Sequence, residues 1–169
     1  MVSLSVQRDS SRYLPCLLTR LTDEHPFSGN DEDFYTTSFS LEQLKQDILM
    51  NLNLLLNART APAESAYLKE HFPEALASGY HFGIDSCTGV AVSSLRPAFL
   101  AELVRKALVV FEPRLEADSI EVHPDFSRGE DRTAVHLSIS SRLAVKPLTQ
   151  DVFFRLRVDM ETGETQMSA

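Results

Sequence analysis

The sequence predicts an α+β fold, in which two main helices pack on a mostly antiparallel sheet made by the C-terminal part of the chain. Two observations predict it. Before residue 112, apolar residues recur at steps of three and four in two long stretches, which is the period of a helix. After it, apolar and polar residues alternate, as in strands with one face in water. Helices followed by a run of strands is the order of an α+β domain.

The first main helix is predicted to begin after Ser40 and to end near Asn57. Ser40 and Gln43 form a capping-box pattern, and Phe39 with Leu44 fits a hydrophobic staple. One face is formed by apolar residues at helical spacing: Leu41, Leu44, Ile48, Leu52 and Leu55. Four more apolar residues widen this face, so we expect burial on more than one side: Leu49, Met50, Leu54 and Leu56.

The second main helix is expected to begin after Ser94, a suitable N-cap, with Pro97 tolerated in the first turn. It should end before Pro113, because proline has no N–H and disfavours the α region for the preceding Glu112. Its buried stripe is predicted at six positions: Leu100, Leu103, Val104, Ala107, Leu108 and Phe111.

Glu112, Pro113 and Arg114 form the least ordinary corner of the sequence. A carboxylate at a helix C-terminus meets the negative end of the helix dipole, which costs about 0.3–1 kcal/mol unless a cation compensates it. Arg114 could be that cation, or both charges could be solvated or kept for another chain. A solvated pair contributes at most about 1 kcal/mol, whereas a buried one costs about 3–5 kcal/mol to break. The sequence leaves these alternatives open.

The remaining third of the chain is predicted to form strands. Apolar residues alternate with polar ones in three stretches: Ile120 and Val122; Val135, Leu137 and Ile139; Val152, Phe154, Leu156 and Val158. A turn at Thr162-Gly163 would return a short final strand over residues 164–167. Phe153, Arg155 and Arg157 would lie on the outer face of the third strand. An extended segment could join an open sheet edge there, or the edge could be protected, with the arginines keeping the surface soluble. The residues alone favour the protected edge.

The domain organisation is expected to be simple. Residues 1–12 are predicted to be a flexible arm and residues 13–169 a single domain, since 169 residues suffice for one core. Residues 13–21 should form a short apolar helical anchor, and residues 22–33 an acidic loop. Between the main helices we expect a short helix interrupted by Pro73, an extended piece or turn over residues 79–83, and a loop over residues 84–93.

Composition excludes several functions. A formal net charge of −8 without a basic cluster argues against binding to nucleic acid or anionic membranes. No apolar stretch is long enough for a membrane span, and no secretion signal begins the chain. Cys16 and Cys87 lack metal spacing and fit a reducing compartment, so a cytoplasmic location is expected. No metal, phosphate-loop or nucleophile motif is present, which predicts a protein without cofactor, metal or catalytic residues.

Four segments carry a resemblance to a known family: residues 15–23 (PCLLTRLTD), residues 52–59 (LNLLLNAR), residues 78–85 (SGYHFGID) and residues 111–115 (FEPRL). Together and in this order, they resemble segments of the sheath-initiator baseplate wedge proteins of contractile phage tails, a family with a lysozyme-like label and a type VI secretion branch, the TssE proteins. They resemble, in turn, the family's N-terminal segment, its Leu-Leu-Asn-x-Arg helix end, its Tyr-Gly-x-x-Asp loop and its Glu-Pro-Arg signature. Met50-Asn51 departs from the usual Arg-Asp pair.

This resemblance implies a structural role in a type VI secretion apparatus. The domain would resemble the handshake domain of the sheath subunit and would sit in the baseplate at the inner face of the cytoplasmic membrane. Glu112, Pro113 and Arg114 would dock on the wedge proteins TssF and TssG, with TssK as a further partner. Phe153, Arg155 and Arg157 would face arms of the sheath proteins TssB and TssC, so that the chain initiates sheath polymerisation.

The alternative function is a small peptidoglycan hydrolase of the lysozyme-like kind, with Glu112 as the acid. Such an enzyme needs two carboxylates beside a cleft, and 24 acidic residues make a pair available without indicating one. The missing export signal argues against it, because the cell wall lies outside the cytoplasm.

Overall fold

The computed structural model describes residues 13–22, 39–86, 97–126, 133–144 and 149–168. The chain divides into two compact units, residues 1–47 and 48–169, and α2 (Leu41–Asn57) contributes to both. The predicted arm, most of the acidic loop and Ser94 lie outside the described residues. The division into an arm and a single domain therefore stays a prediction.

In the first unit, polar contacts attach the short helix α1 (Leu17–Leu21) to α2. Cys16 caps α1, since its sulfur accepts a hydrogen bond from the Thr19 N–H at 3.4 Å. The carboxylate of Asp47, 4% exposed, accepts from the Cys16 N–H at 3.1 Å and from the Thr19 hydroxyl. One buried carboxylate on α2 thus holds the N-terminus of α1.

The prediction that residues 13–21 form an apolar anchor is wrong for the leucines of this segment, which are exposed. Tyr13 is buried and pairs with Phe39 in an isolated antiparallel bridge. Four leucines are instead 55–72% exposed: Leu14, Leu17, Leu18 and Leu21. The physical reason is length, because a helix of five residues makes little more than one turn and points its side chains in all directions.

Helix α2 begins as predicted and is buried on a narrower face than predicted. Gln43 accepts from the Ser40 N–H at 2.9 Å while its own N–H donates to Ser40 Oγ at 3.3 Å, which confirms the capping box. Beside Asp47, five apolar residues of α2 are buried: Leu44, Ile48, Leu52, Leu55 and Leu56. Met50 and Leu54 are 61% and 52% exposed. The prediction that α2 is buried on more than one side is therefore wrong at these two positions.

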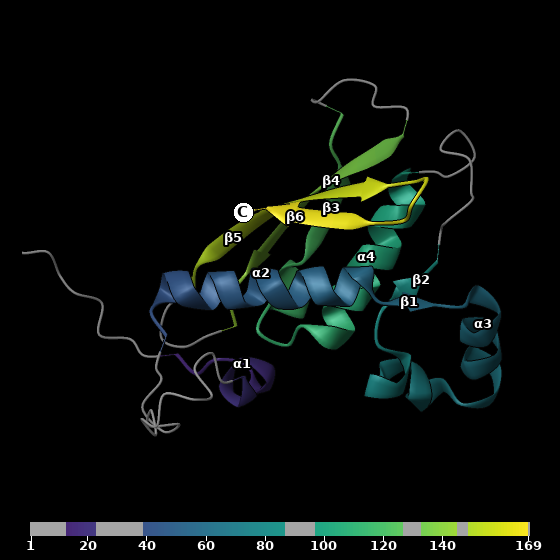
Figure 1. Ribbon diagram of the computed structural model, residues 1–169, viewed down its shortest axis with the longest axis horizontal. Helices are drawn as coiled ribbons and strands as arrows, with labels where there is room; N and C mark the ends of the chain where they lie inside the picture. The colour runs from purple at the N-terminus through teal and green to yellow at the C-terminus, as the bar shows by residue number, and fades with distance from the viewer. Residues whose placement is uncertain (1–12, 23–38, 87–96, 127–132, 145–148, 169) are drawn as a thin grey trace, which may run out of the picture. The chain divides into compact units, whose positions relative to one another are not determined.

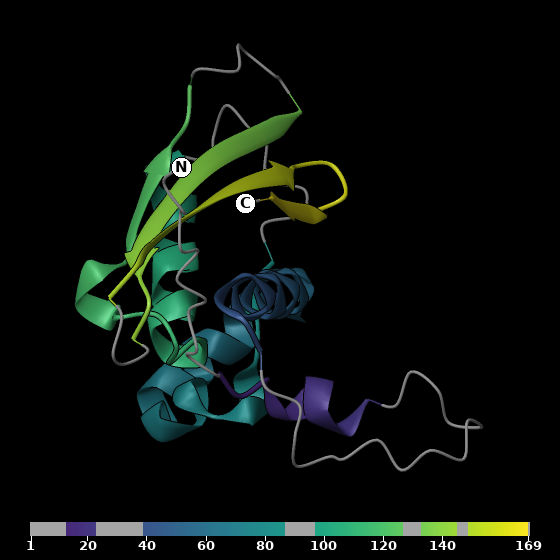
Figure 2. The same cartoon turned by 90° about the vertical axis from the view of Figure 1, so that its left-hand side faces the viewer.

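The second unit contains the predicted sheet. Strands β3 (Glu121–Pro124), β4 (Ala134–Arg142), β5 (Asp151–Asp159) and β6 (Thr165–Ser168) are antiparallel neighbours in the order β3-β4-β5-β6. Figures 1 and 2 show them as one twisted sheet with α4 (Pro97–Phe111) along it. The α+β fold is confirmed; the handshake resemblance stays an expectation.

Strand alternation separates the core from a polar face. The apolar residues predicted to be buried on β4 and β5 are buried: Val135, Leu137, Ile139, Val152, Phe154, Leu156 and Val158. Ala134 and Ser141 of β4 are buried as well. The buried face of α4 is formed by Leu100, Ala101, Val104, Ala107 and Leu108, while Leu103 and Phe111 are half-buried. In the described parts of the chain, no helix is both long and apolar enough to cross a membrane.

The predicted turn between the last two strands is confirmed. Asp159 Oδ1 accepts from the N–H groups of Glu161 at 3.0 Å and Thr162 at 3.1 Å. These backbone donors, Thr162 first, lower the pKa of Asp159. Gly163 adopts φ 76°, a left-handed conformation that glycine tolerates without strain.

A small helical lobe precedes α4. Helix α3 (Pro62–His71) is followed by two 3₁₀ turns, η1 (Pro73–Ala77) and η2 (Gly79–His81), which confirms the interruption at Pro73. β1 (Arg59–Thr60) pairs in parallel with β2 (Ile84–Asp85). The loop expected over residues 84–93 is therefore wrong at its start, because β1 supplies backbone partners from a distant part of the sequence.

Gly83 permits the close approach of the lobe to α2. Its φ is +133°, and a Cβ placed there would lie 2.5 Å from the carbonyl oxygen of Ala58. The Ile84 N–H donates to that same oxygen at 3.1 Å, which starts the β1–β2 pairing. Only a residue without Cβ fits this contact.

Gly83→Ala is expected to lower the free energy of unfolding by about 1–3 kcal/mol, since it combines an unfavourable φ with a clash against backbone. Urea unfolding of the full chain measures this change. Gly79→Ala is the matched control, because a Cβ at Gly79 meets nothing within 4 Å. Equal stabilities of the two variants would contradict the role assigned to Gly83.

Candidate functional site

The predicted corner lies directly after α4. The Glu112 N–H donates to Leu108 O at 3.0 Å as the last helical bond, and the Leu115 N–H donates to Glu112 O at 3.1 Å to close a turn. Pro113 is exposed at the tip of this turn. The helix therefore ends where the proline predicted.

Glu112 and Arg114 pair with each other inside this turn. Arg114 Nε donates to Glu112 Oε1 at 2.6 Å and Nη2 donates to Oε2 at 2.7 Å, a two-bond contact between guanidinium and carboxylate. Glu112 is 3% exposed, and the Arg114 side chain is 20% exposed. Of the alternatives left open by the sequence, Arg114 as the compensating cation is confirmed. Binding of a partner by these residues stays a prediction.

The corner is also fastened to the end of β4. The Ala144 N–H donates to Arg114 O at 2.7 Å, and Leu115 forms an isolated bridge with Leu143. One residue further, Glu116 forms an ion pair with Arg142 at 3.0 Å. Since Leu115 and Leu143 are both buried, the turn is held on both sides of Arg114 and its shape is fixed.

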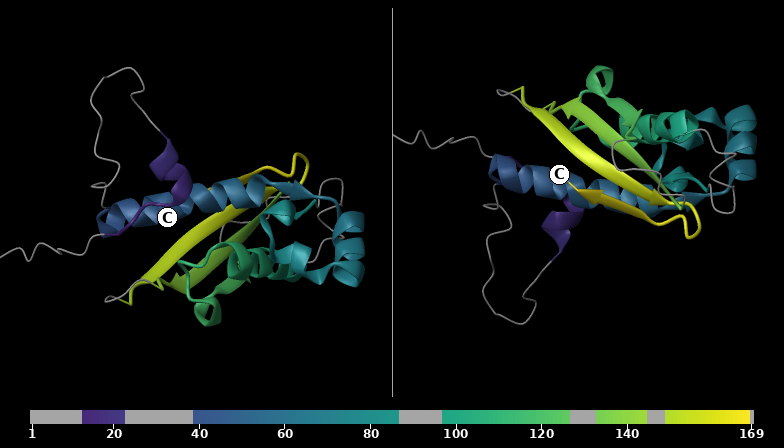
Figure 3. Two further views of the ribbon diagram at one scale, coloured as in Figure 1. Left: turned by 90° about the horizontal axis from the view of Figure 1, so that it is seen from below. Right: turned by 90° about the horizontal axis from the view of Figure 1, so that it is seen from above.

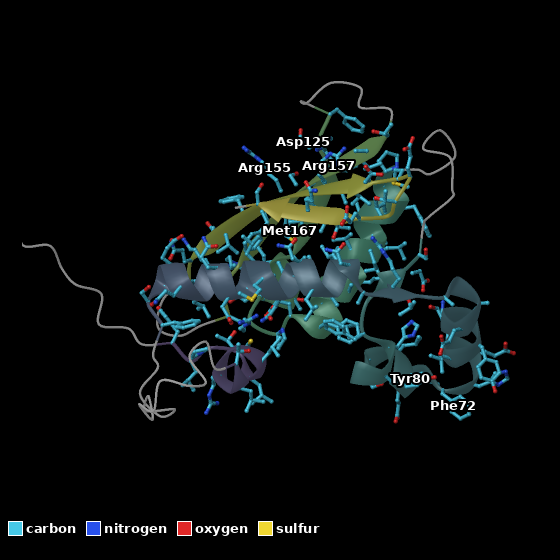
Figure 4. The ribbon with its side chains drawn as sticks, viewed as in Figure 1. Phe72, Tyr80, Asp125, Arg155, Arg157 and Met167 are labelled. Atoms are coloured by element: carbon cyan, nitrogen blue, oxygen red, sulfur yellow. The ribbon has the colours of Figure 1, made fainter. Side chains whose placement is uncertain are left out.

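The other predicted binding residues lie on the polar face of β5. Phe153 is 69% exposed, Arg155 is exposed, and Arg157 is half-buried with Nη1 3.7 Å from Asp159 Oδ2. Figure 4 shows Arg155 and Arg157 projecting from the strand. The outer-face placement is confirmed. β5 is nevertheless an inner strand, because it pairs with β4 on one side and with β6 on the other. The prediction of an open edge beside these residues is therefore wrong, except over residues 151–154, which have no β6 residue opposite them.

The outer edge of β6 is covered by α2, a contact that sequence reasoning missed. Asn57 Oδ1 accepts from the Thr165 N–H at 2.9 Å, and Asn57 Nδ2 donates to Thr165 O at 3.1 Å. Asn53 Oδ1 accepts from the Met167 N–H at 3.1 Å. Figures 1 and 3 show β6 running beside α2. The two asparagines, four residues apart on one helix face, replace the neighbouring strand that an edge lacks.

A Ser-His-Asp cluster, also missed, lies in the small lobe. Ser65 Oγ lies 3.0 Å from His81 Nε2 and donates to Asp85 Oδ1, which also accepts from the Thr60 hydroxyl at 2.9 Å. The carboxylate of Asp85 thus binds the serine hydroxyl itself. A nucleophilic triad requires the opposite order, with histidine as base and the carboxylate on its other nitrogen. This cluster instead joins α3, η2 and β2.

The geometry of Glu112 does not suit the acid of a hydrolase. Both of its oxygens accept from Arg114, and the carboxyl is buried, so neither oxygen is available to give a proton to a bound substrate. Among the described residues, no group of three or more His, Cys, Asp or Glu side chains could hold a metal ion.

Arg114→Ala is expected to lower the free energy of unfolding by about 3–5 kcal/mol, because it leaves the Glu112 carboxylate buried and uncompensated. Chemical denaturation at neutral pH measures the loss. Arg105→Ala is the matched control. Arg105 also makes two bonds to a carboxylate, that of Glu102, at 3.0 and 3.2 Å.

The control differs in exposure, since the Arg105 and Glu102 side chains are 40% and 45% exposed. The hydrogen bond from Arg105 lowers the pKa of Glu102, yet water screens this exposed pair, so Arg105→Ala should cost much less stability than Arg114→Ala. If both arginine variants lost the same stability, burial would not be the source of the strength of the Glu112 pair.

Amide hydrogen exchange is expected to separate the two asparagine contacts. Asn57→Ala should increase exchange at the Thr165 amide, and Asn53→Ala should increase it at the Met167 amide, each lost bond being worth about 1 kcal/mol. Each variant serves as the control for the other. Unchanged protection at both amides in the double variant would show that β6 is closed by something else.

The family comparison agrees with the resemblance read from the sequence. A family model described as baseplate wedge protein gp25 matches residues 42–148, which include α4, the Glu112 to Arg114 corner and β4. The comparisons with curated proteins and with solved structures gave no match. Because the family model covers more than half of the 169 residues, the chain belongs to the family of baseplate wedge protein gp25, structural components of phage-tail-like baseplates.

Proposed function

We propose that this chain is the TssE component of a type VI secretion baseplate. It docks on the wedge proteins TssF and TssG, with TssK as a further partner, and initiates polymerisation of the TssB–TssC sheath. The family match over residues 42–148 carries this proposal, because it includes the Glu-Pro-Arg corner. In this role the protein is a scaffold without catalytic residues or cofactor, in the cytoplasm at the inner face of the membrane.

The geometry of the corner supports its use as a docking point. Pro113 is exposed at the tip, and the Arg114 side chain is 20% exposed while that of Glu112 is 4% exposed. A partner would therefore meet Pro113 and the outer side of Arg114. Glu112 would act through Arg114 by fixing its orientation. Rigid presentation lowers the entropy lost on binding.

The sheet supports a narrower place for the sheath arms than the sequence suggested. The β6 edge already bonds to Asn53 and Asn57, so an added strand would have to displace α2. Residues 151–154 of β5 have β4 on one side and no β6 residue opposite them. We place the arm there, with Phe153 beside it and Arg155 and Arg157 further along the same face.

The docking role is tested with a variant that removes the charges but keeps the fold. Glu112→Leu with Arg114→Met replaces a buried ion pair by apolar side chains of similar size, which is often neutral for stability. Tagged full-length chain is co-expressed with TssF and TssG from the same organism. Thermal unfolding and the amount of co-purified TssF and TssG are measured.

Wild type is expected to retain both wedge proteins, and the double variant, with a Tm close to that of wild type, to retain about tenfold less, equivalent to about 1.4 kcal/mol. Glu102→Leu with Arg105→Met removes the same charges from the exposed pair and should retain wild-type amounts. Undiminished co-purification by a folded corner variant would exclude the docking role.

The TssE assignment has its own test in cells. A strain lacking its TssE gene should assemble fluorescent TssB–TssC sheaths again when it expresses this chain. Absence of sheaths together with no wild-type binding to TssF and TssG would exclude the assignment, whatever the corner variant does.

A further inference from the structure

An open groove lies on the polar face of the sheet, where β3, β4 and β5 meet the 3₁₀ turn η3 (Ala117–Ser119). Its volume is about 370 Å³. The lining includes Asp118, Glu121, Arg142, Asp151 and Phe153. Arg142 also forms the ion pair with Glu116 that lies just after the docking corner.

The register of the sheet builds this groove. Glu121 lies opposite Ser140, Ser140 lies opposite Phe153, and Arg142 lies opposite Asp151. Ser119 holds η3 against the sheet, since its Oγ accepts from the Arg142 N–H at 2.9 Å and donates to Glu116 O at 2.8 Å. The walls are therefore fixed by strand pairing and by the hydrogen bonds of Ser119.

The groove carries unbalanced negative charge. Its one cation, among the described lining residues, is Arg142, which is already paired with Glu116 at 3.0 Å. The side-chain carboxylates of Asp118 and Asp151 have no hydrogen-bond or ion-pair partner in the part of the chain that the structure describes. Glu121 has only His123, at 3.6 Å. Three carboxylates thus line the groove with a single described cation, Arg142, whose charge is already shared with Glu116.

An exposed aromatic ring stands in the same groove. Phe153 is 69% exposed although its neighbours along β5, Val152 and Phe154, are buried. A ring face beside carboxylates suits a planar guanidinium, which stacks on aromatic rings and donates to two oxygens at once. An ammonium group makes the charge contact but stacks less well. The described acidic residues form no group able to hold a metal ion.

We propose that this groove binds an arginine side chain presented by a segment of another protein. The contact uses side chains on the face of the sheet, so it differs from strand addition at residues 151–154 and from docking at the Glu112 corner. It does not depend on the proposed secretion role.

The test uses the full-length ¹⁵N-labelled chain and a defined probe, the peptide acetyl-Gly-Ser-Arg-Ser-Gly-amide. Amide shift changes in NMR titration should concentrate at residues 118–121, 140–142 and 151–153. The same peptide with citrulline in place of arginine keeps the shape but not the charge, and should cause no change. A lysine peptide should bind about threefold more weakly.

Matched variants separate the groove from the general negative charge. Asp118→Asn, Glu121→Gln and Asp151→Asn together should weaken binding at least about tenfold. Glu70→Gln, Glu74→Gln and Glu161→Gln remove the same charge from exposed residues outside the lining, and should leave binding within about twofold. Phe153→Ser should weaken binding about threefold without changing the net charge.

Three results would overturn the proposal: no localised shifts, equal binding of the citrulline peptide, or equal weakening by both triple variants. Sedimentation velocity tests another occupant. Self-association of wild type that the groove variant abolishes would assign the groove to a second copy of this chain, and would also overturn the proposal of a different protein.

Discussion

The buried ion pair between Glu112 and Arg114 is the contact on which the second unit's central corner depends. Glu112 ends α4 where the helix dipole disfavours a carboxylate, and burial adds a desolvation cost. Arg114 offsets both with two hydrogen bonds, while its carbonyl accepts from Ala144 beyond β4. One arginine thus neutralises the helix end and joins it to the sheet. The direction in which the chain leaves α4 follows from this pair.

Side-chain hydrogen bonds fix several junctions of the described structure. Asn57 closes the free edge of β6, Ser65 links His81 to Asp85 in the small lobe, and Asp47 accepts from the N-terminus of α1. In each of these places the polar side chains bind other parts of the fold. This arrangement agrees with a structural baseplate family, in which surfaces have to be presented rigidly.

Particular surfaces of the described structure therefore remain exposed to partners. The edge of β6 is occupied, whereas the polar face of the sheet shows Phe153 and Arg155 to solvent, and Pro113 stands at the tip of the corner. Arg142 connects these places, since it pairs with Glu116 just after the corner and lies opposite Asp151 at the start of β5. A partner bound at the corner and a partner bound in the groove would thus lie close together at one end of the sheet.

By itself, the sequence determined the order of helices and strands, because periods of 3.6 and 2 residues are local properties, and it placed the helix end at Pro113. It also determined the polar face of β5. Only the tertiary structure decided that Glu112 pairs with Arg114, that Asn57 closes β6, and that Gly83 lies against Ala58. These contacts depend on burial or on pairs of residues far apart in the sequence, and neither produces a periodic pattern in the sequence. The sequence does not show whether an ionisable side chain lies in water or is paired with a guanidinium. Its burial depends on the packing of the whole unit.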